Sequence, residues 1–212
     1  MRITPIQTLD DVKRVYKFLT DRFTEESRES YQVPFPLADT YSGMMEQIEN
    51  KQKLQLKAEK RGLLIGFIAA QDKDKNSHDV YIQCIVVRKQ YLKSGVGGTL
   101  MRSMEYVLRK AGYTVAKINE YEGSNFFFMK SGFTPYLYVT CPSEEAAKNV
   151  KHHKLNRMDF VEEYEKDGKF VIKFDVLDEP VQQYKKYFMD LGDSIEASYV
   201  YEKIYLKSNS FA

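Results

Sequence analysis

Three glycines within four residues, Gly95, Gly97 and Gly98, stand directly before a stretch whose apolar residues have helical spacing. Glycine loses more conformational freedom on folding than any other residue, so such a cluster is expected where the backbone turns sharply or another group approaches it closely. Gly112 marks the end of the helical stretch. The glycines are therefore predicted at the N-terminus of a helix, where free N–H groups and the helix dipole favour an anion such as phosphate. A tight turn that binds nothing is the alternative.

The segments on both sides of this helix predict a mixed α/β fold. Helical spacing predicts one helix that begins after Thr8, which can cap it, and a second that ends near residue 50, behind an irregular loop with two prolines. Apolar and β-branched runs predict two strands around a turn at 60–62 and a third at 79–87, joined as an antiparallel meander. After the glycine-loop helix, the pattern predicts a strand at 114–119, a short helix within 122–133 and a strand at 134–139. Strand, glycine loop, helix and strand make a βαβ unit.

The composition of the 212 residues excludes several classes of protein. With 32 Lys and Arg against 30 Asp and Glu, the net charge of +2 favours neither nucleic acid nor an anionic membrane as a partner. No apolar run reaches the roughly 18 residues of a membrane span, and the N-terminus lacks the pattern of a signal peptide, so we expect a soluble, cytoplasmic protein. Cys84 and Cys141 lack zinc-ligand spacing, and the adjacent His152 and His153 are expected on a solvated surface, so no metal site is predicted.

Two other phosphate-binding motifs fit the sequence poorly. The Walker motif requires Gly-Lys followed by Ser or Thr, whereas the only Gly-Lys of the chain, at 168–169, precedes Phe170. The dinucleotide fingerprint requires a glycine where Leu100 stands, and its first glycine should follow the strand directly. Glu120 lies near the distance expected of a ribose-binding acid, so a dinucleotide-binding oxidoreductase stays open as the weakest alternative.

The segment "VVRKQYLKSGVGGTLM", followed later by "NFFFMKSGF", resembles the GNAT superfamily of N-acetyltransferases. The resemblance covers about residues 1 to 140 and includes the order of the predicted elements. The superfamily's signature is Arg or Gln, two residues, Gly, one residue, and Gly or Ala, and Leu92, Gly95 and Gly97 take these three positions here. Leu92 lacks the side-chain donor of the signature, and Lys93 is the candidate to compensate as a point charge. The second signature, Lys-x-Gly-Phe after an aromatic helix, is met at 130–133.

The resemblance implies a GNAT-like acyl-CoA N-acyltransferase fold, in which the sheet splays between the strands at 79–87 and 114–119. Acetyl-CoA would lie in this opening, and the amine acceptor would enter from the opposite face. The pantetheine would pair with the end of the first strand, and the backbone amides of the glycine loop would hold the pyrophosphate. The residues expected to bind the cosubstrate are Ile85, Val86, Val87, Leu92, Lys93, Ser94, Gly95, Val96, Gly97, Gly98, Asn125 and Phe128.

The groups that move protons depart from the superfamily's pattern. The tyrosine that protonates the leaving thiolate in the superfamily aligns with Phe128, and Tyr121 and Tyr136, which flank the short helix, are the candidate substitutes. The nearest carboxylates for a base that acts through water are Asp79, at the start of the central strand, and Glu120, at the end of the next strand. Packed tyrosines and solvated carboxylates are the alternative interpretations.

Beyond residue 140 the resemblance ends. Residues 141–168 are charged and are predicted as an exposed helical linker, and residues 169–212 as a strand-helix-strand extension of the acetyltransferase domain at 1–140. The extension is too aromatic to be disordered and too small to fold alone. We therefore expect it to bury its apolar face on the first domain or in a homodimer.

The resemblance therefore implies an acetyl-CoA-dependent N-acyltransferase, and we expect it to use no metal. The amine would attack the thioester directly in a ternary complex, and the acceptor would be a primary amine of a small molecule, an amino acid or a peptide. The second hypothesis is a protein of the same fold that binds acyl-CoA as a non-catalytic regulator or interaction module. It is kept because Leu92 and Phe128 depart from the signature.

Overall fold

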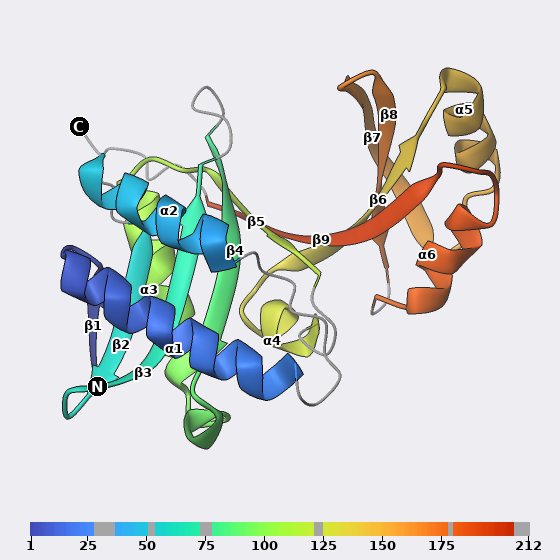
Figure 1. Ribbon diagram of the computed structural model, residues 1–212. Coiled ribbons are helices and arrows are strands. Elements are labelled where there is room, and N and C mark those ends of the chain that lie inside the picture. Colours follow the sequence, from blue (N-terminus) through green and yellow to red (C-terminus); the bar gives the residue numbers. More distant parts are fainter. Residues whose placement is uncertain (28–36, 51–53, 73–77, 121–124, 178–179, 206–212) are drawn as a thin grey trace, which may run out of the picture. The chain divides into compact units, whose positions relative to one another are not determined.

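The computed structural model describes residues 1–27, 37–50, 54–72, 78–120, 125–177 and 180–205 (Figure 1). The chain divides into two compact units, of which the first holds residues 1–116 with Tyr205 and the second holds residues 117–204. None of the helices formed by the described residues is long and apolar enough to span a membrane.

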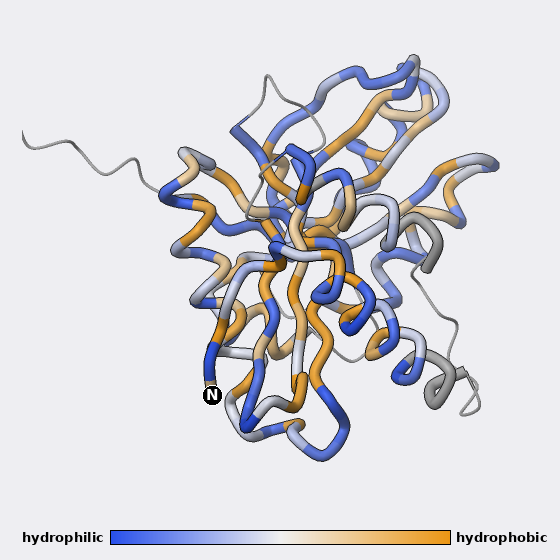
Figure 2. The backbone as a smooth tube through the Cα atoms, turned by 60° about the vertical axis from the view of Figure 1, so that its left-hand side comes forward, coloured by the Kyte–Doolittle hydropathy of each residue, from blue (hydrophilic) through white to orange (hydrophobic). Residues whose placement is uncertain are grey.

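The first unit is a sheet with helices on both faces. Strands β1 (Arg2–Pro5), β2 (Gln55–Lys60), β3 (Leu63–Gln71) and β4 (Asp79–Val87) pair antiparallel in chain order. Helices α1 (Leu9–Ser27) and α2 (Leu37–Glu49) pack on one face, and α3 (Val96–Lys110) packs on the other (Figure 1). Figure 2 shows apolar residues along these strands and hydrophilic ones in the turns. The meander is as the sequence predicts, and β1 was not predicted.

The predicted cap of the first helix is confirmed. The hydroxyl oxygen of Thr8 accepts a hydrogen bond from the backbone N–H of Asp11, at 3.1 Å. Val12, Val15 and Leu19 then recur on the buried side of α1 and form part of the core with residues of β3 and β4. The predicted contribution of Phe23 and the loop with two prolines lie outside the described side chains.

Gly66 allows α3 to approach the sheet closely. A Cβ atom at this position would lie 2.9 Å from Leu100 Cδ1 and 3.2 Å from the carbonyl oxygen of Val86. Side-chain atoms at such distances overlap, so only glycine permits the observed packing of the helix that follows the glycine loop.

Substitution of Gly66 by alanine is therefore expected to lower the free energy of unfolding by about 1–3 kcal/mol, because α3 must move away from β3. Gly43→Ala is a matched control, since a Cβ there would meet no atom within 4 Å, in the interior of α2. That change should stabilise the protein by about 0.5–1 kcal/mol through helix propensity. Urea unfolding of both variants checks the prediction, and equal stabilities would contradict it.

The second unit is a four-stranded antiparallel sheet with helices. Its strands lie in the order β9 (Glu196–Ile204), β6 (Thr134–Cys141), β8 (Lys169–Val176) and β7 (Met158–Lys166). The unit also contains α4 (Asn125–Lys130), α5 (Glu144–His152) and α6 (Gln182–Met189). β5 (Val115–Asn119) begins in the first unit and ends in the second. The rings of Phe174 on β8 and Phe188 on α6 stack at 5.5 Å and anchor α6.

The prediction of a helical linker over 141–168 is wrong for its second half. Helix α5 forms as expected, with the Ser143 hydroxyl as its cap, but residues 158–166 form β7. The two-residue turn Asp167-Gly168, with both φ angles positive, joins β7 to β8 as a hairpin. The charges suggested a solvated helix, yet they are equally compatible with a strand at the end of the sheet, which exposes its side chains.

The strands of the predicted extension lie on either side of β6, so the boundary between the units does not fall at residue 140. Large side chains that were expected to seek another surface, such as Tyr184 and Phe188, are buried, and the Phe188 ring contacts Phe174 and Tyr187 within the second unit. A homodimer through residues 169–212 stays a prediction, and its premise of exposed aromatic surface is weakened.

The chain returns to the first unit at Tyr205. The backbone N–H of Tyr205 donates to the carbonyl oxygen of Thr114 at 2.6 Å, and the Arg109 guanidinium lies 4.7 Å from the centre of its ring. The Tyr205 side chain is buried. The first unit is thus formed from two segments of the chain, on both sides of the second unit.

Candidate active site

The glycine loop lies between β4 and α3, as predicted. A short 3-10 helix, η1 (Lys89–Tyr91), follows β4, and Gly95 is the N-cap residue of α3 with φ 85°. The Gly95 carbonyl oxygen accepts the N–H of Thr99, and no side chain caps the helix. Helix geometry therefore leaves the first N–H groups of α3 without an intrahelical acceptor. A Cβ on Gly95 would meet no atom within 4 Å, so the space beside this glycine is open.

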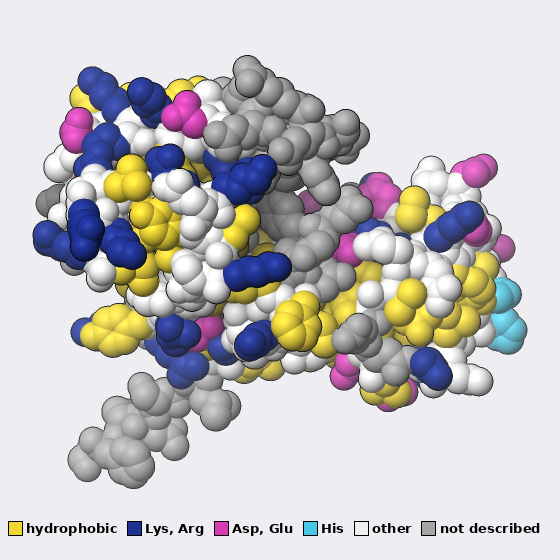
Figure 3. Space-filling view, turned by 90° about the horizontal axis from the view of Figure 1, so that it is seen from below, with side chains coloured by type: hydrophobic (Ala, Val, Ile, Leu, Met, Phe, Trp, Pro, Cys, Tyr) yellow, Lys and Arg dark blue, Asp and Glu magenta, His cyan; other side chains and the backbone are white. Residues whose placement is uncertain are grey.

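The side chains around the loop differ in what they offer an anion. Leu92 is 50 % exposed and offers no donor, and Lys93 is exposed with a φ of 58°. The Ser94 hydroxyl donates to the Tyr91 carbonyl oxygen at 2.6 Å and is thereby held within the loop. This end of the first unit, at the foot of β4 in Figure 1, carries many Lys and Arg side chains and few acidic ones in Figure 3.

Arg102 is a cation near the loop that the sequence interpretation missed. Its Nη2 donates to the Thr99 hydroxyl at 3.1 Å, and its Nη1 lies 3.5 Å from where a Cβ of Gly98 would stand. The signal was its position four residues after Gly98, which places both residues on one face of α3. Arg102 is therefore a candidate to supply the charge that Leu92 does not.

The end of β4 has one pairing edge occupied by β3. Ile85, Val86 and Val87 face Ile68, Phe67 and Gly66 in the antiparallel register. The Val86 side chain belongs to the core formed with α1 and α2, whereas Ile85 and Val87 are half-buried and point to the other face of the strand. Their predicted pairing with pantetheine needs only backbone groups and stays a prediction.

Both cysteines of the chain are buried thiols. Burial raises the pKa of the Cys84 thiol, on β4, to about 12, and burial with the nearby Glu163 raises that of Cys141 to about 11. The thiolate is the nucleophilic form, so neither side chain is suited to form an acyl-enzyme near neutral pH. No group of three or more potential metal ligands occurs among the described residues.

The two candidate carboxylates have different surroundings. Asp79, the first residue of β4, is half-buried and has an interaction partner. The Glu120 side chain is 9 % exposed, accepts a hydrogen bond from Lys185 Nζ at 2.8 Å, and accepts another from the Gln182 side chain. The alternative interpretation of Glu120 as a solvated charge is therefore wrong, and its carboxylate links the end of β5 to α6.

Two of the predicted site residues cannot be placed in full. Tyr121 lies outside the described residues, and Asn125 begins α4 but its side chain is not among those described.

Tyr136, on β6, belongs to a polar cluster on one face of the second unit's sheet. Lys173 Nζ lies 4.1 Å from the centre of the Tyr136 ring and 2.7 Å from Glu202 Oε2, and the Tyr138 hydroxyl donates to the same carboxylate. Burial raises the pKa of Tyr136, although Lys173 opposes this shift. Tyr136 therefore holds its proton at neutral pH, as both a packed tyrosine and a general acid would.

A different tyrosine lies beside Phe128. The Phe128 side chain on α4 is 2 % exposed, and its ring centre lies 5.3 Å from that of Tyr201, on β9. The Tyr201 hydroxyl is buried and has no hydrogen-bond partner among the described residues, and burial raises its pKa. The sequence gives no signal for this pair, because Phe128 on α4 and Tyr201 on β9 are far apart in the chain.

The comparisons with known proteins agree with this arrangement. The family model of the acetyltransferase (GNAT) family matches residues 15–133, from α1 to the end of the aromatic helix motif. No curated protein sequence matches the chain.

Many solved structures are similar in fold, including the following two. One is a protein assigned to the GNAT acetyltransferase family from Desulfovibrio desulfuricans, with 11 % identity over 82 % of this chain and 96 % of that chain and a TM-score of 0.52. The other is the N-acetylglutamate synthase of Neisseria gonorrhoeae in complex with coenzyme A and N-acetyl-glutamate, with 13 % identity over 96 % of this chain but only 34 % of that chain and a TM-score of 0.50. The family model matches more than half of this chain's residues, and the glycine loop lies at the N-terminus of α3 as the family signature requires. This chain therefore belongs to the GNAT acetyltransferase family.

Proposed function

We propose that the protein transfers the acetyl group of acetyl-CoA to a primary amine of a small molecule, an amino acid or a peptide. Membership of the family supports N-acetyltransferase activity in general. The observation that supports acetyl-CoA as the cosubstrate is the N-terminus of α3, which no side chain caps and which follows a left-handed glycine with open space beside it. Such a terminus suits a pyrophosphate, because its N–H groups and dipole favour negative charge.

The cosubstrate would be held by three sets of groups. The amides at the start of α3 would bind the pyrophosphate, Lys93 and Arg102 would add positive charge, and the backbone at the end of β4 would pair with the pantetheine. Acetyl-CoA supplies the activated acyl group as a thioester. The chain's own residues have to orient the thioester, accept a proton from the amine and donate a proton to the thiolate.

The chemistry that fits these residues is direct attack. The amine nitrogen forms a bond to the thioester carbonyl carbon, the bond from that carbon to sulfur breaks, the amine loses a proton and the thiolate gains one. The buried, protonated cysteines disfavour an acyl-cysteine intermediate. Asp79 is the candidate to accept the amine's proton through water, and Tyr201 joins Tyr136 as a candidate donor to the thiolate, because its proton is retained and its hydroxyl has no competing partner among the described residues.

A non-catalytic acyl-CoA-binding module is the second candidate function. Leu92 replaces the donor of the family signature, and Phe128 offers no proton. A protein of that kind would bind CoA and leave the thioester intact.

The test measures binding and chemistry separately. Calorimetry with CoA measures affinity, and a thiol reagent measures CoA released from acetyl-CoA in the presence of amino acids, peptides and polyamines. Amine-dependent release supports the proposed transferase, and binding without release for any amine supports the module. Failure to bind CoA at all would contradict both.

A further inference from the structure

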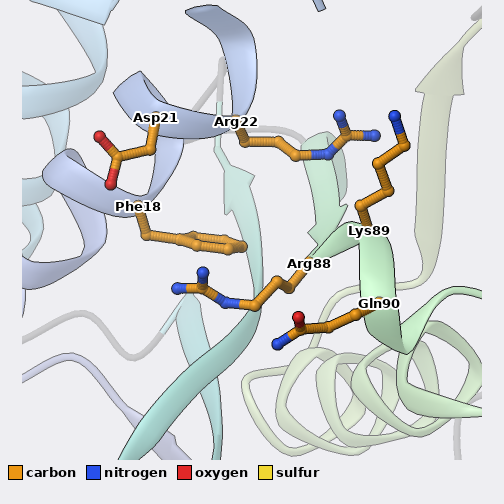
Figure 4. Close-up of a pocket in the computed structure, with 6 residues that line it drawn as sticks. All are labelled: Phe18, Asp21, Arg22, Arg88, Lys89 and Gln90. Atoms are coloured by element: carbon orange, nitrogen blue, oxygen red, sulfur yellow. The ribbon is translucent and has the colours of Figure 1, made fainter. Parts of the chain in front are cut away.

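A cavity of about 340 Å³ lies within the first unit, between α1 and the connection from β4 to α3 (Figure 4). Its lining residues are Phe18, Asp21, Arg22, Arg88, Lys89 and Gln90. Three of these side chains are cations and one is an anion, in a chain whose overall charge is close to balanced. The lining is therefore locally positive.

Arg88 is held firmly in this cavity. Its backbone N–H donates to the Ile65 carbonyl oxygen at 2.9 Å, and its Nε donates to the Leu64 carbonyl oxygen at 3.1 Å. The guanidinium carbon lies 5.4 Å from the centre of the buried Phe18 ring, which Figure 4 shows above it. A guanidinium fixed through Nε and by a ring keeps its two Nη groups in a defined plane, which suits an anion with two oxygens.

Arg22 and Lys89 add charge from two further elements. Figure 4 shows the Arg22 and Lys89 side chains, from α1 and η1, extending to one side of the cavity, whereas the Arg88 side chain extends to the other side, under the Phe18 ring. Both also have interaction partners of their own, so Arg88 is the central residue of the site.

The position of the cavity relates it to the acceptor. It lies on the α1 side of the sheet, and α3 with its open N-terminus packs on the other side. Arg88 directly follows the last residue of β4. Since a strand rises about 3.3 Å per residue, its backbone lies about 10 Å along the strand from Ile85, whose backbone we expect to pair with the cosubstrate.

We propose that this cavity binds the carboxylate or phosphate of an acidic amine acceptor. The proposal depends on the proposed function and narrows it: the anionic group is separated from the reacting amine by a chain of several bonds, longer than in an α-amino acid. An ω-amino acid and a short peptide with a free carboxylate both have this form.

The binding experiment uses anions that need no turnover. Calorimetry compares N-acetyl-ε-aminocaproate with its primary amide, on the wild-type protein and on Arg88→Met, Arg88→Lys and Lys89→Gln. Hydrogen bonds to a charged group change affinity by about tenfold or more, so the wild type should bind the acid at least about tenfold more tightly than the amide. Arg88→Met should abolish this preference, Arg88→Lys should restore part of it, and Lys89→Gln, on an exposed side chain, should reduce it. Lys17→Met, an exposed cation of α1 outside the lining, should retain it.

The kinetic experiment compares ε-aminocaproate with the amino alcohol of the same length as acceptors. The KM should be at least about tenfold lower for the acid, and Arg88→Met should remove that difference. Equal binding of acid and amide by the wild type, or no binding of either, would overturn the proposal. A loss of affinity in Arg88→Met for CoA but not for dephospho-CoA would assign the cavity to the cosubstrate's phosphate and would also overturn it. Acid-selective binding without thioester cleavage for any amine would leave the anion site standing and refute the transferase.

Discussion

Replacement of Gly97 by valine is expected to weaken CoA binding at least about a hundredfold. Gly97 lies in the first turn of α3, where the N–H groups have no intrahelical acceptor. A branched side chain there would keep phosphate oxygens away from the N–H groups of this turn. Loss of two charge-assisted hydrogen bonds at about 1.5 kcal/mol or more each corresponds to this change in affinity.

Calorimetry with CoA on the folded variant measures this effect. Lys110→Val places the same β-branched side chain at the exposed, opposite end of α3 and should leave the affinity for CoA within about twofold. A cooperative urea unfolding transition in each variant establishes that it is folded. An unchanged affinity in a folded Gly97→Val variant would mean that the loop only turns the chain.

Replacement of Tyr201 by phenylalanine is expected to lower kcat about a hundredfold while leaving stability unchanged or raised. General acid catalysis accounts for about this factor or more. The Tyr201 hydroxyl is buried without a partner among the described residues, so its removal relieves a cost in the folded state. Tyr205→Phe is a matched control, because the Tyr205 hydroxyl is also buried without such a partner, but its ring lies beside Arg109 in the last turn of α3, at the far end of that helix from the glycine loop. That variant should keep its turnover.

The role of Tyr201 is tested further by placing a hydroxyl on the neighbouring ring of Phe128. In the double variant Phe128→Tyr with Tyr201→Phe, the hydroxyl comes from α4, and kcat should recover by about tenfold or more over Tyr201→Phe alone. Because burial raises the pKa of Tyr201 above the ordinary tyrosine value of about 10, this group should cause no loss of turnover at lower pH. Full activity of Tyr201→Phe would exclude Tyr201, and the same measurement on Tyr136→Phe would then examine the remaining described donor.

Elements whose signal is local in the sequence were predicted well. Three such elements are the cap at Thr8, the meander around the turn at 60–62 and the glycine loop ahead of α3. Each is signalled by residues only a few positions apart in the sequence. Their side-chain chemistry and spacing are sufficient, because the competing conformations are excluded by the same few residues.

Features that depend on distant pairings were missed. The charged sequence of β7 predicts a helix as long as its pairing with β8 is not known. The dipeptide Asp167-Gly168 was nevertheless a usable signal for a hairpin turn. The approach of Tyr201 to Phe128 and the cavity around Arg88 each join segments far apart in the chain. No periodicity encodes such contacts, so the sequence could name Phe128 as a departure from the family and could not name the residue beside it.

The hydrogen bond between Tyr205 and Thr114 has consequences for folding during synthesis and for the design of a shorter chain. Since Tyr205 is a buried part of the first unit, that unit cannot complete its core during synthesis until the whole second unit and Tyr205 have left the ribosome. The second unit is topologically an insertion, and the chain leaves and re-enters its host at points one hydrogen bond apart. Ends so close allow an inserted unit to be replaced by a short linker. A chain in which a few glycines join residue 116 to Tyr205 would therefore show whether the host folds and binds CoA without its insertion.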